Sequence, residues 1–385
     1  MFGKKKTRKK WHRPVGFIFS IVSLIVLTYV SVLLITGRPV NFAWLMGIFS
    51  SRTPIEIVDE LLFDVGRDRV FADLGGSIAS AGTLGIQVLD YSGNEMLREP
   101  FRMSRPAMSA VNSRAIAFDV GGTAVRVFDS GRMLSSVETS GAIISASINR
   151  NGWFSVGTQE GRGLRGVITV YNDRGNDVFR VNLGSGYAFA SALSPDNRSL
   201  AVLNLTDVGS RITLYHGLNQ VDYSGVFVLS GGLILDILFL PNGELLALST
   251  NALIGIDRNG TGRELFDFFD KRLGGFILDD GTIVLHLLDY GIGHSGRLVR
   301  LDERGRLEAE VATNREIVSK SFSGRYLAVM YSDGVVFYDR NLEELPLYAQ
   351  QASLAGTSRV LSLGHGVALA TGEHVTVAVR REDRD

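Results

Sequence analysis

The stretch IISASINRNGWFSVGTQEGRGLRGVITVYNDRGNDVFRVNL (residues 143–183) contains each element of the pattern that decides the fold. Short runs of β-branched, aromatic and small residues alternate with turn signals such as Asn151-Gly152. Asn-Gly is a hairpin signal because a tight turn needs a positive φ at a central residue. The stretch therefore predicts four short antiparallel strands joined by turns.

The same unit recurs along the chain, and its clearest mark is an apolar strand that ends in Asp before a turn. The anchor positions are Asp90, Asp129, Asp173, Tyr215, Asp257, Asp302 and Asp339, where Tyr215 belongs to a degenerate copy, ITLYHGLN (residues 212–219), that lacks the Asp. They follow one another at intervals of 37 to 45 residues. A period of this length made of short strands is typical of propeller blades. We therefore expect an all-β fold, a β-propeller.

The two ends of the repeat region predict how the ring closes. Residues 359–383 align with residues 69–93 strand for strand, but the chain ends before a fourth strand. Residues 55–63 precede the first unit and alternate as a strand does. We expect residues 55–63 to complete the last unit. This count gives eight blades, or seven if one weak unit is misread.

A basic tail and an apolar run precede the repeats. The first 13 residues hold seven cations and no acid, and residues 15–36 are 22 residues without a charge. This run is about 33 Å long as a helix, enough to cross a hydrocarbon core of roughly 30 Å. A buried core helix would show a polar face. A cleaved signal peptide would have a shorter apolar region and a small-residue cleavage site.

These features predict a single-pass signal anchor in a cell membrane, with the lipid bilayer as partner of residues 15–36. The positive-inside rule places the basic tail, residues 1–14, in the cytoplasm. Residues 37–53 would then form a juxtamembrane stalk, and residues 54–385 an extracytoplasmic propeller.

Composition excludes several classes of protein. The 385 residues contain no cysteine, so disulfides, thiolate metal sites and thiol nucleophiles are excluded. Forty basic residues balance forty acidic ones, which gives no argument for nucleic-acid binding. Without the tail, 33 cations and 40 anions remain, a net charge of −7.

The order of these segments resembles a bacterial family of single-pass, membrane-anchored β-propellers that carry a domain of unknown function. Its most specific parts here are the unit 143–183 and SPDNRSLAV (residues 194–202). The repeats are more distantly similar to quinoprotein-like and WD-like propellers, without the Trp-Asp and Gly-His marks of true WD repeats. The resemblance implies a fold and a topology, and no reaction.

Other motifs favour structural roles. Two G-x-G-x-x-G matches, at 161–166 and 291–296, precede strands instead of helices, so we interpret them as hairpin loops. Asp at the end of a strand in each unit is expected to cap the same turn. His286 lies in an apolar strand and is expected to be a core histidine with satisfied hydrogen bonds. The six histidines form no metal motif, and we expect no metal or other cofactor.

Three loops between second and third strands look long: 158–166, 204–211 and 287–297. Loops on a rigid scaffold often carry binding sites. They offer as candidate ligand-binding residues Glu160, Arg162, Arg165, Asp207, Arg211, Asp289, Tyr290, His294 and Arg297.

The favoured function is a non-catalytic binding or scaffold module of the cell envelope, whose loops bind a protein or a glycan. The alternative is an envelope lyase or hydrolase at the channel mouth. A sensor that signals through the span is disfavoured because residues 1–14 are too few for a signalling domain.

Overall fold

The alternation of apolar strands with turn residues produces an all-β structure in the computed structural model of the chain. The structure describes residues 53–159, 166–184, 186–218, 223–279, 281–291, 293–323, 326–345, 347–348, 359–363, 366–370 and 374–380. All of them belong to one compact unit that begins at Thr53.

Seven sheets each consist of four consecutive antiparallel strands. The first three are β2 (Val70–Asp73), β3 (Ser77–Gly82), β4 (Gly85–Asp90) and β5 (Glu95–Pro100); β6 (Pro106–Val111), β7 (Arg114–Asp119), β8 (Ala124–Asp129) and β9 (Met133–Glu138); and β10 (Ala142–Ile148), β11 (Phe154–Gln159), β12 (Gly166–Tyr171) and β13 (Asp177–Leu183). The next two are β14 (Tyr187–Leu193), β15 (Ser199–Thr206), β16 (Gly209–His216) and β17 (Gly225–Ser230); and β18 (Ile234–Phe239), β19 (Leu245–Ser249), β20 (Ala252–Ile256) and β21 (Gly262–Asp267). The last two are β22 (Arg272–Asp279), β23 (Thr282–Leu288), β24 (Gly296–Leu301) and β25 (Leu307–Thr313); and β26 (Ile317–Ser323), β27 (Tyr326–Tyr331), β28 (Gly334–Tyr338) and β29 (Glu344–Leu345).

A further sheet joins the two ends of the described chain. Its five strands, in order, are β30 (Leu347–Tyr348), β1 (Thr53–Leu62), β33 (His374–Arg380), β32 (Gly366–Ala370) and β31 (Arg359–Ser362). β1 runs antiparallel to β33, with Ile55 opposite Arg380 and Leu62 opposite His374. The predicted closure of the last unit by residues 55–63 is confirmed.

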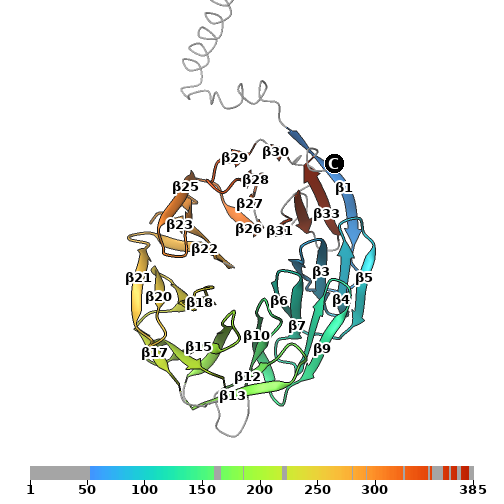
Figure 1. The fold of residues 1–385 in the computed structure, drawn as a ribbon. Coiled ribbons are helices and arrows are strands. Elements are labelled where there is room, and N and C mark those ends of the chain that lie inside the picture. The colour runs from blue at the N-terminus through green and yellow to red at the C-terminus, as the bar shows by residue number, and fades with distance from the viewer. Residues whose placement is uncertain are drawn as a thin grey trace, which may run out of the picture. The chain divides into compact units, whose positions relative to one another are not determined.

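The sheets form a ring (Figure 1), in which the first strand of each sheet lies at the inner edge and the fourth at the rim. The inner strands contact one another in the order β2, β6, β10, β14, β18, β22, β26, β31 and back to β2. The β-propeller fold is thus confirmed. Seven blades consist of four consecutive strands each. The predicted count of eight includes the closing sheet as a blade. That sheet differs from the other seven because its strands come from both ends of the described chain.

The hydrophobic core lies between neighbouring sheets. The middle strands β3, β12 and β20 are buried at every position, since sheets cover both of their faces. One such cluster packs Ile86 and Phe101 from one blade against Ala117 and Phe128 from the next. This packing between blades explains why the strands are apolar on both faces instead of alternating.

The aspartates at the ends of third strands cap the turns that follow, as predicted. Asp302 Oδ1 accepts hydrogen bonds from the backbone N–H groups of Arg304 and Arg306 at 2.9 and 2.8 Å. The same two bonds form at Asp90, Asp257 and Asp339, and at Asp129 the second donor is the N–H three residues on instead of four. In the third unit the capping residue is Asn172 and not the predicted Asp173.

Across the part of the chain that the structure describes, no helix has the length and apolar character needed to cross a bilayer. The predicted tail (1–14) and span (15–36), and the stalk (37–53) except for Thr53, lie outside the described residues.

Candidate functional site

Strand direction gives the ring two distinct faces. Within each blade the strands alternate in direction, so the first-to-second and third-to-fourth turns lie at one end, which we call the turn face. The second-to-third loops and the connections between blades lie at the other end, the loop face. The six candidate residues that the structure describes belong to segments at or next to the loop face.

Three of the nine, Glu160, Arg162 and Arg165, lie outside the described residues. The first glycine motif falls there too, apart from Gly166, at which β12 begins. The second motif, 291–296, leads into β24 and not into a helix, as the hairpin interpretation predicts.

The predicted long loop at 204–211 is wrong. β15 and β16 pair continuously from Asn204 opposite Arg211 to Thr206 opposite Gly209, so only Asp207 and Val208 form the turn. Asp207 is exposed, whereas Arg211 lies within β16 and its Nε is buried without a hydrogen-bond partner. The polar residues that suggested a loop are members of a strand ladder.

The loop between β23 and β24 is long, as predicted, and it is charged. Asp289 Oδ1 lies 2.7 Å from Lys271 Nζ, and Ser295 Oγ donates to Asp289 Oδ2 at 2.7 Å. The Lys271 ammonium and the Ser295 hydroxyl hold the pKa of Asp289 below its usual value. His294 lies 4.0 Å from Glu316. These contacts fasten the loop to the neighbouring connection.

The remaining candidates do not join one cluster. Tyr290 is 71% exposed on the same loop as Asp289. Arg297 Nη1 is engaged by Glu310 Oε2 at 2.9 Å on the adjacent strand. Asp207 and Arg211 belong to the blade β14–β17, which the blade β18–β21 separates from this loop. The structure therefore divides the predicted residues between two places on the loop face.

Exposed apolar side chains on the loop face are a feature that sequence reasoning missed. Tyr187, Phe189, Val208 and Leu233 are 58, 42, 57 and 39% exposed. They surround the β15–β16 turn, because Tyr187 pairs with Leu205 and Gly231 N donates to Val208 O at 2.8 Å. We call these four residues the apolar corner. No periodicity marks them, since they occupy a bulge, a turn and a connection.

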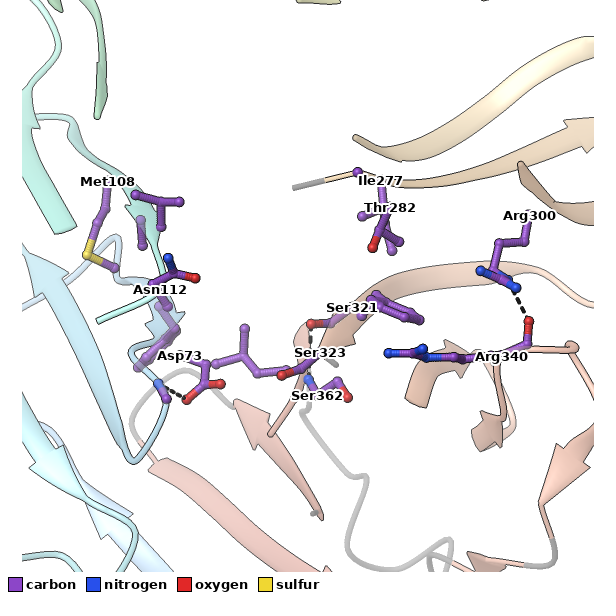
Figure 2. A pocket seen from close by; sticks show the side chains of 18 residues that line it. Asp73, Met108, Asn112, Ile277, Thr282, Arg300, Ser321, Ser323, Arg340 and Ser362 are labelled. Atoms are coloured by element: carbon purple, nitrogen blue, oxygen red, sulfur yellow. Dashed lines mark hydrogen bonds between the residues drawn. The ribbon is translucent and has the colours of Figure 1, made fainter. Parts of the chain in front are cut away.

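The larger cavity opens at the opposite end of the ring. It has a volume of about 720 Å³ and lies between inner strands and their turns. Figure 2 shows Asp73 and Asn112 on one side of it and Arg300 and Arg340 on another. Its charged side chains are engaged: Tyr91 donates to Asp73 at 2.7 Å, and Arg300 pairs with Glu308 at 2.7 Å.

A second cavity of about 440 Å³ adjoins the first, and Ala110, Val111 and Gly281 line both. Small residues in the inner strands leave this space, for example Ser147 and Ser191. Their hydroxyls are tied into the wall: Ser147 Oγ donates to Ser191 O at 2.7 Å. The signal in the sequence was the run of Ala and Ser in the first strands, whose convergence depends on ring closure.

Metal binding has no support in the described ranges: no group of three or more His, Asp or Glu side chains lies close enough to hold an ion.

Comparison with known proteins identifies relatives in sequence and in fold. The sequence profile of a family described as "Family of unknown function (DUF5711)" matches residues 52–344. No protein with a curated description matches the chain in sequence.

Solved structures share the fold at low sequence identity. The C-terminal WD40 domain of Sif2 has a TM-score of 0.62 and 15% identity over 86% of this chain and 99% of that domain. BamB from Moraxella catarrhalis has a TM-score of 0.51 and 17% identity, covering 84% and 99%. The quinohemoprotein alcohol dehydrogenase ADHIIG from Pseudomonas putida HK5 has a TM-score of 0.51 and 13% identity, covering 85% and 76%. Only the last is an enzyme by its printed name, so the shared fold does not choose between binding and catalysis.

Proposed function

We propose that this chain, which belongs to the family of unknown function DUF5711, is a non-catalytic binding or scaffold module. In this proposal the loop face presents the apolar corner to a protein partner of the cell envelope. The exposed apolar corner is the observation that carries the proposal.

Exposed apolar groups favour a protein partner over a glycan. Single exposed apolar residues are ordinary, but a group of large ones on one edge is typical of an interaction site. Tyr187 and Phe189 offer aromatic area of the kind enriched in the centres of protein interfaces. The charged loop with Asp289 and Lys271 would form part of a polar rim.

The position of Thr53 supports presentation of this face. Ile55 pairs with the end of β33, so β1 starts at the turn face and ends with Leu62 at the loop face. Thr53, at which the described chain begins, therefore lies at the turn-face edge, and the loop face is the opposite end of the ring.

Two tyrosines of one blade provide a matched test. Tyr187 is 58% exposed at the loop face, and Tyr223 is 61% exposed at the turn between β16 and β17. A photo-crosslinking amino acid at each position of the full chain, activated in cells, should give a discrete protein adduct from 187 and none from 223. Equal adducts from both positions, or none from 187, would contradict the proposal. The topology has its own test: a reporter enzyme that works only outside the cytoplasm, fused to the C-terminus, should be active.

The turn-face cavity favours a second candidate, a small-molecule site or an enzyme at the channel mouth. Its volume of about 720 Å³ is suitable for a small ligand. The charged side chains that line it, such as Asp73 and Arg300, already pair with other residues of this chain. This pairing favours ligand binding over acid–base chemistry. Turnover of an envelope substrate that survives blockage of the loop face would support this candidate.

A further inference from the structure

The propeller contains two lysines, and their surroundings are opposite. After residue 10 the sequence has only Lys271 and Lys320. Lys271 pairs with Asp289 at 2.7 Å and with Asp270 at 3.8 Å, and the Asp289 carboxylate raises the pKa of Lys271. Lys320 has no hydrogen bond or ion pair within the described residues, and burial lowers the pKa of its ammonium group. A half-buried cation without a counterion is energetically costly.

Lys320 crosses from its own blade to the next one. It belongs to the inner strand β26, and its Nζ lies over Gly275 in β22 of the neighbouring blade. A Cβ atom at position 275 would collide with Nζ. Glycine at this position therefore leaves the room into which the lysine extends.

His286 lies beside this place and has an unused ring nitrogen. It pairs with Gly275 across the strands β22 and β23 and is 5% exposed. Its Nε2 is buried without a hydrogen-bond partner, contrary to the expectation of a satisfied core histidine. Burial, with the charges of Lys320, His294 and Arg272, lowers the pKa of His286 to about 4. The ring is thus neutral at pH 7 and can donate one N–H.

The groups around His286 are predominantly basic. The charges of Lys320, His294 and Arg272 add to the effect of burial in lowering the pKa of His286, and the carboxylate of Glu316 lies 4.0 Å from His294. Arg272 starts β22 and, like Lys320, has no acid within ion-pairing distance in the described part of the chain. Within the described residues, Lys320 and Arg272 thus have no acidic partner, and the buried Nε2 of His286 has no hydrogen-bond partner.

We propose that Arg272, His286, His294 and Lys320 form a binding site for the oxyanion group, phosphate or carboxylate, of a small ligand. An oxyanion would accept hydrogen bonds from the Lys320 ammonium and the His286 ring and would neutralise the local positive charge. The site lies between two blades in the half of the ring toward the loop face. It is separate from the turn-face cavity and does not depend on the protein partner proposed above.

Calorimetric titration of the full-length chain tests this site. Inorganic phosphate and sodium acetate, each at constant ionic strength against a chloride control, distinguish the two oxyanion sources. Lys320→Met should weaken binding of the preferred anion about tenfold or more, because it removes a charge-assisted hydrogen bond. Lys271→Met is the matched control and should leave binding unchanged, and Lys320→Arg should retain it.

Failure of both anions to bind, or equal losses in Lys320→Met and Lys271→Met, would overturn the proposal. Should Lys320→Met fail to fold, Arg272→Gln at an exposed position decides, with weaker binding expected and unchanged binding contradicting the site. Bound anion should also raise the pKa of His286, as followed by NMR titration of its ring. An unchanged His286 pKa at saturating anion would place the anion elsewhere.

Discussion

Both faces of the ring contain connections between successive strands, but the connections differ between the two faces. At the turn face, five aspartates and Asn172 each fasten a third-to-fourth turn with two side-chain-to-backbone bonds. At the loop face, a two-residue turn at Asp207 and a charged seven-residue loop at 289–295 occupy equivalent places. Repeated contacts build the scaffold, whereas departures from the repeat leave exposed apolar groups and unpaired buried nitrogens. The comparison predicts different responses to mutation at the two faces.

The largest effect is expected from His286, in the loop-face half. Its folded pKa of about 4 lies below the ordinary value of 6.5, so the unfolded chain binds the proton more readily. Its contribution to stability is lost as pH falls from about 6.5 to 4, by roughly 3 kcal/mol in total. His286→Leu should remove this part of the pH dependence, as measured by denaturant unfolding at several pH values.

The exposed Val228, in a blade that does not contain His286, supplies the control for that slope. Val228→Ala changes no titratable group and should leave the pH dependence of unfolding as it is in the wild type. Parallel curves for the wild type and His286→Leu would show that His286 is not held neutral, and would remove the contrast between the faces.

Asn149 at the turn face should give the next largest effect. Its Nδ2 donates to Ser194 O at 3.1 Å in the neighbouring blade, and its Oδ1 accepts from Asn151 N and Trp153 N, both at 3.0 Å. Asn149→Ala removes these three bonds, one of them to the buried Ser194, and should lower the unfolding free energy by about 2 kcal/mol. Asn251→Ala, at an exposed loop-face position, should have little effect; equal losses would contradict the assignment.

Asp302 tests the repeated cap with two substitutions. Asp302→Ala should cost about 1 kcal/mol, the usual cost of a lost capping side chain. Asp302→Asn should cost less, because Asn172 performs the same function in the third unit. Although burial alone would raise the pKa of Asp302, bonds from Arg306 and Arg304 lower it. The advantage of Asp over Asn is therefore present near neutral pH and lost as pH falls below about 4.

Chemical denaturation of both variants at neutral and acid pH measures these differences. An Asp302→Asn variant as unstable as Asp302→Ala would mean that the ion pair with Arg306, and not the backbone cap, holds the turn.

The sequence predicts most of the scaffold because each blade repeats the same local physics. Asp302 and its equivalents follow from turn chemistry, and the pairing of β1 with β33 follows from one missing strand. Position 173 and the loop at 204–211 were assigned wrongly, because Asn172 can cap as Asp does and Asn204 pairs within a ladder. The apolar corner, the cavities and the contact of Lys320 with Gly275 depend on which blades become neighbours. Such contacts between blades leave no periodic signal.

The smallest effect on stability is expected at Asp289, a loop-face carboxylate with as many partners as a cap. Its bonds go to the side-chain ends of Lys271 and Ser295, while the loop is closed by the backbone bond from Asp289 N to Ser295 O at 2.9 Å. Asp289→Ala should therefore leave the unfolding midpoint unchanged, because exposed ion pairs contribute little. It should lower the pKa of Lys271 toward its ordinary value, as followed by NMR. A loss of stability comparable to that of Asp302→Ala would show that the loop face is fastened by its carboxylates as firmly as the turn face, and the distinction between a repeated scaffold and a variable surface would fail.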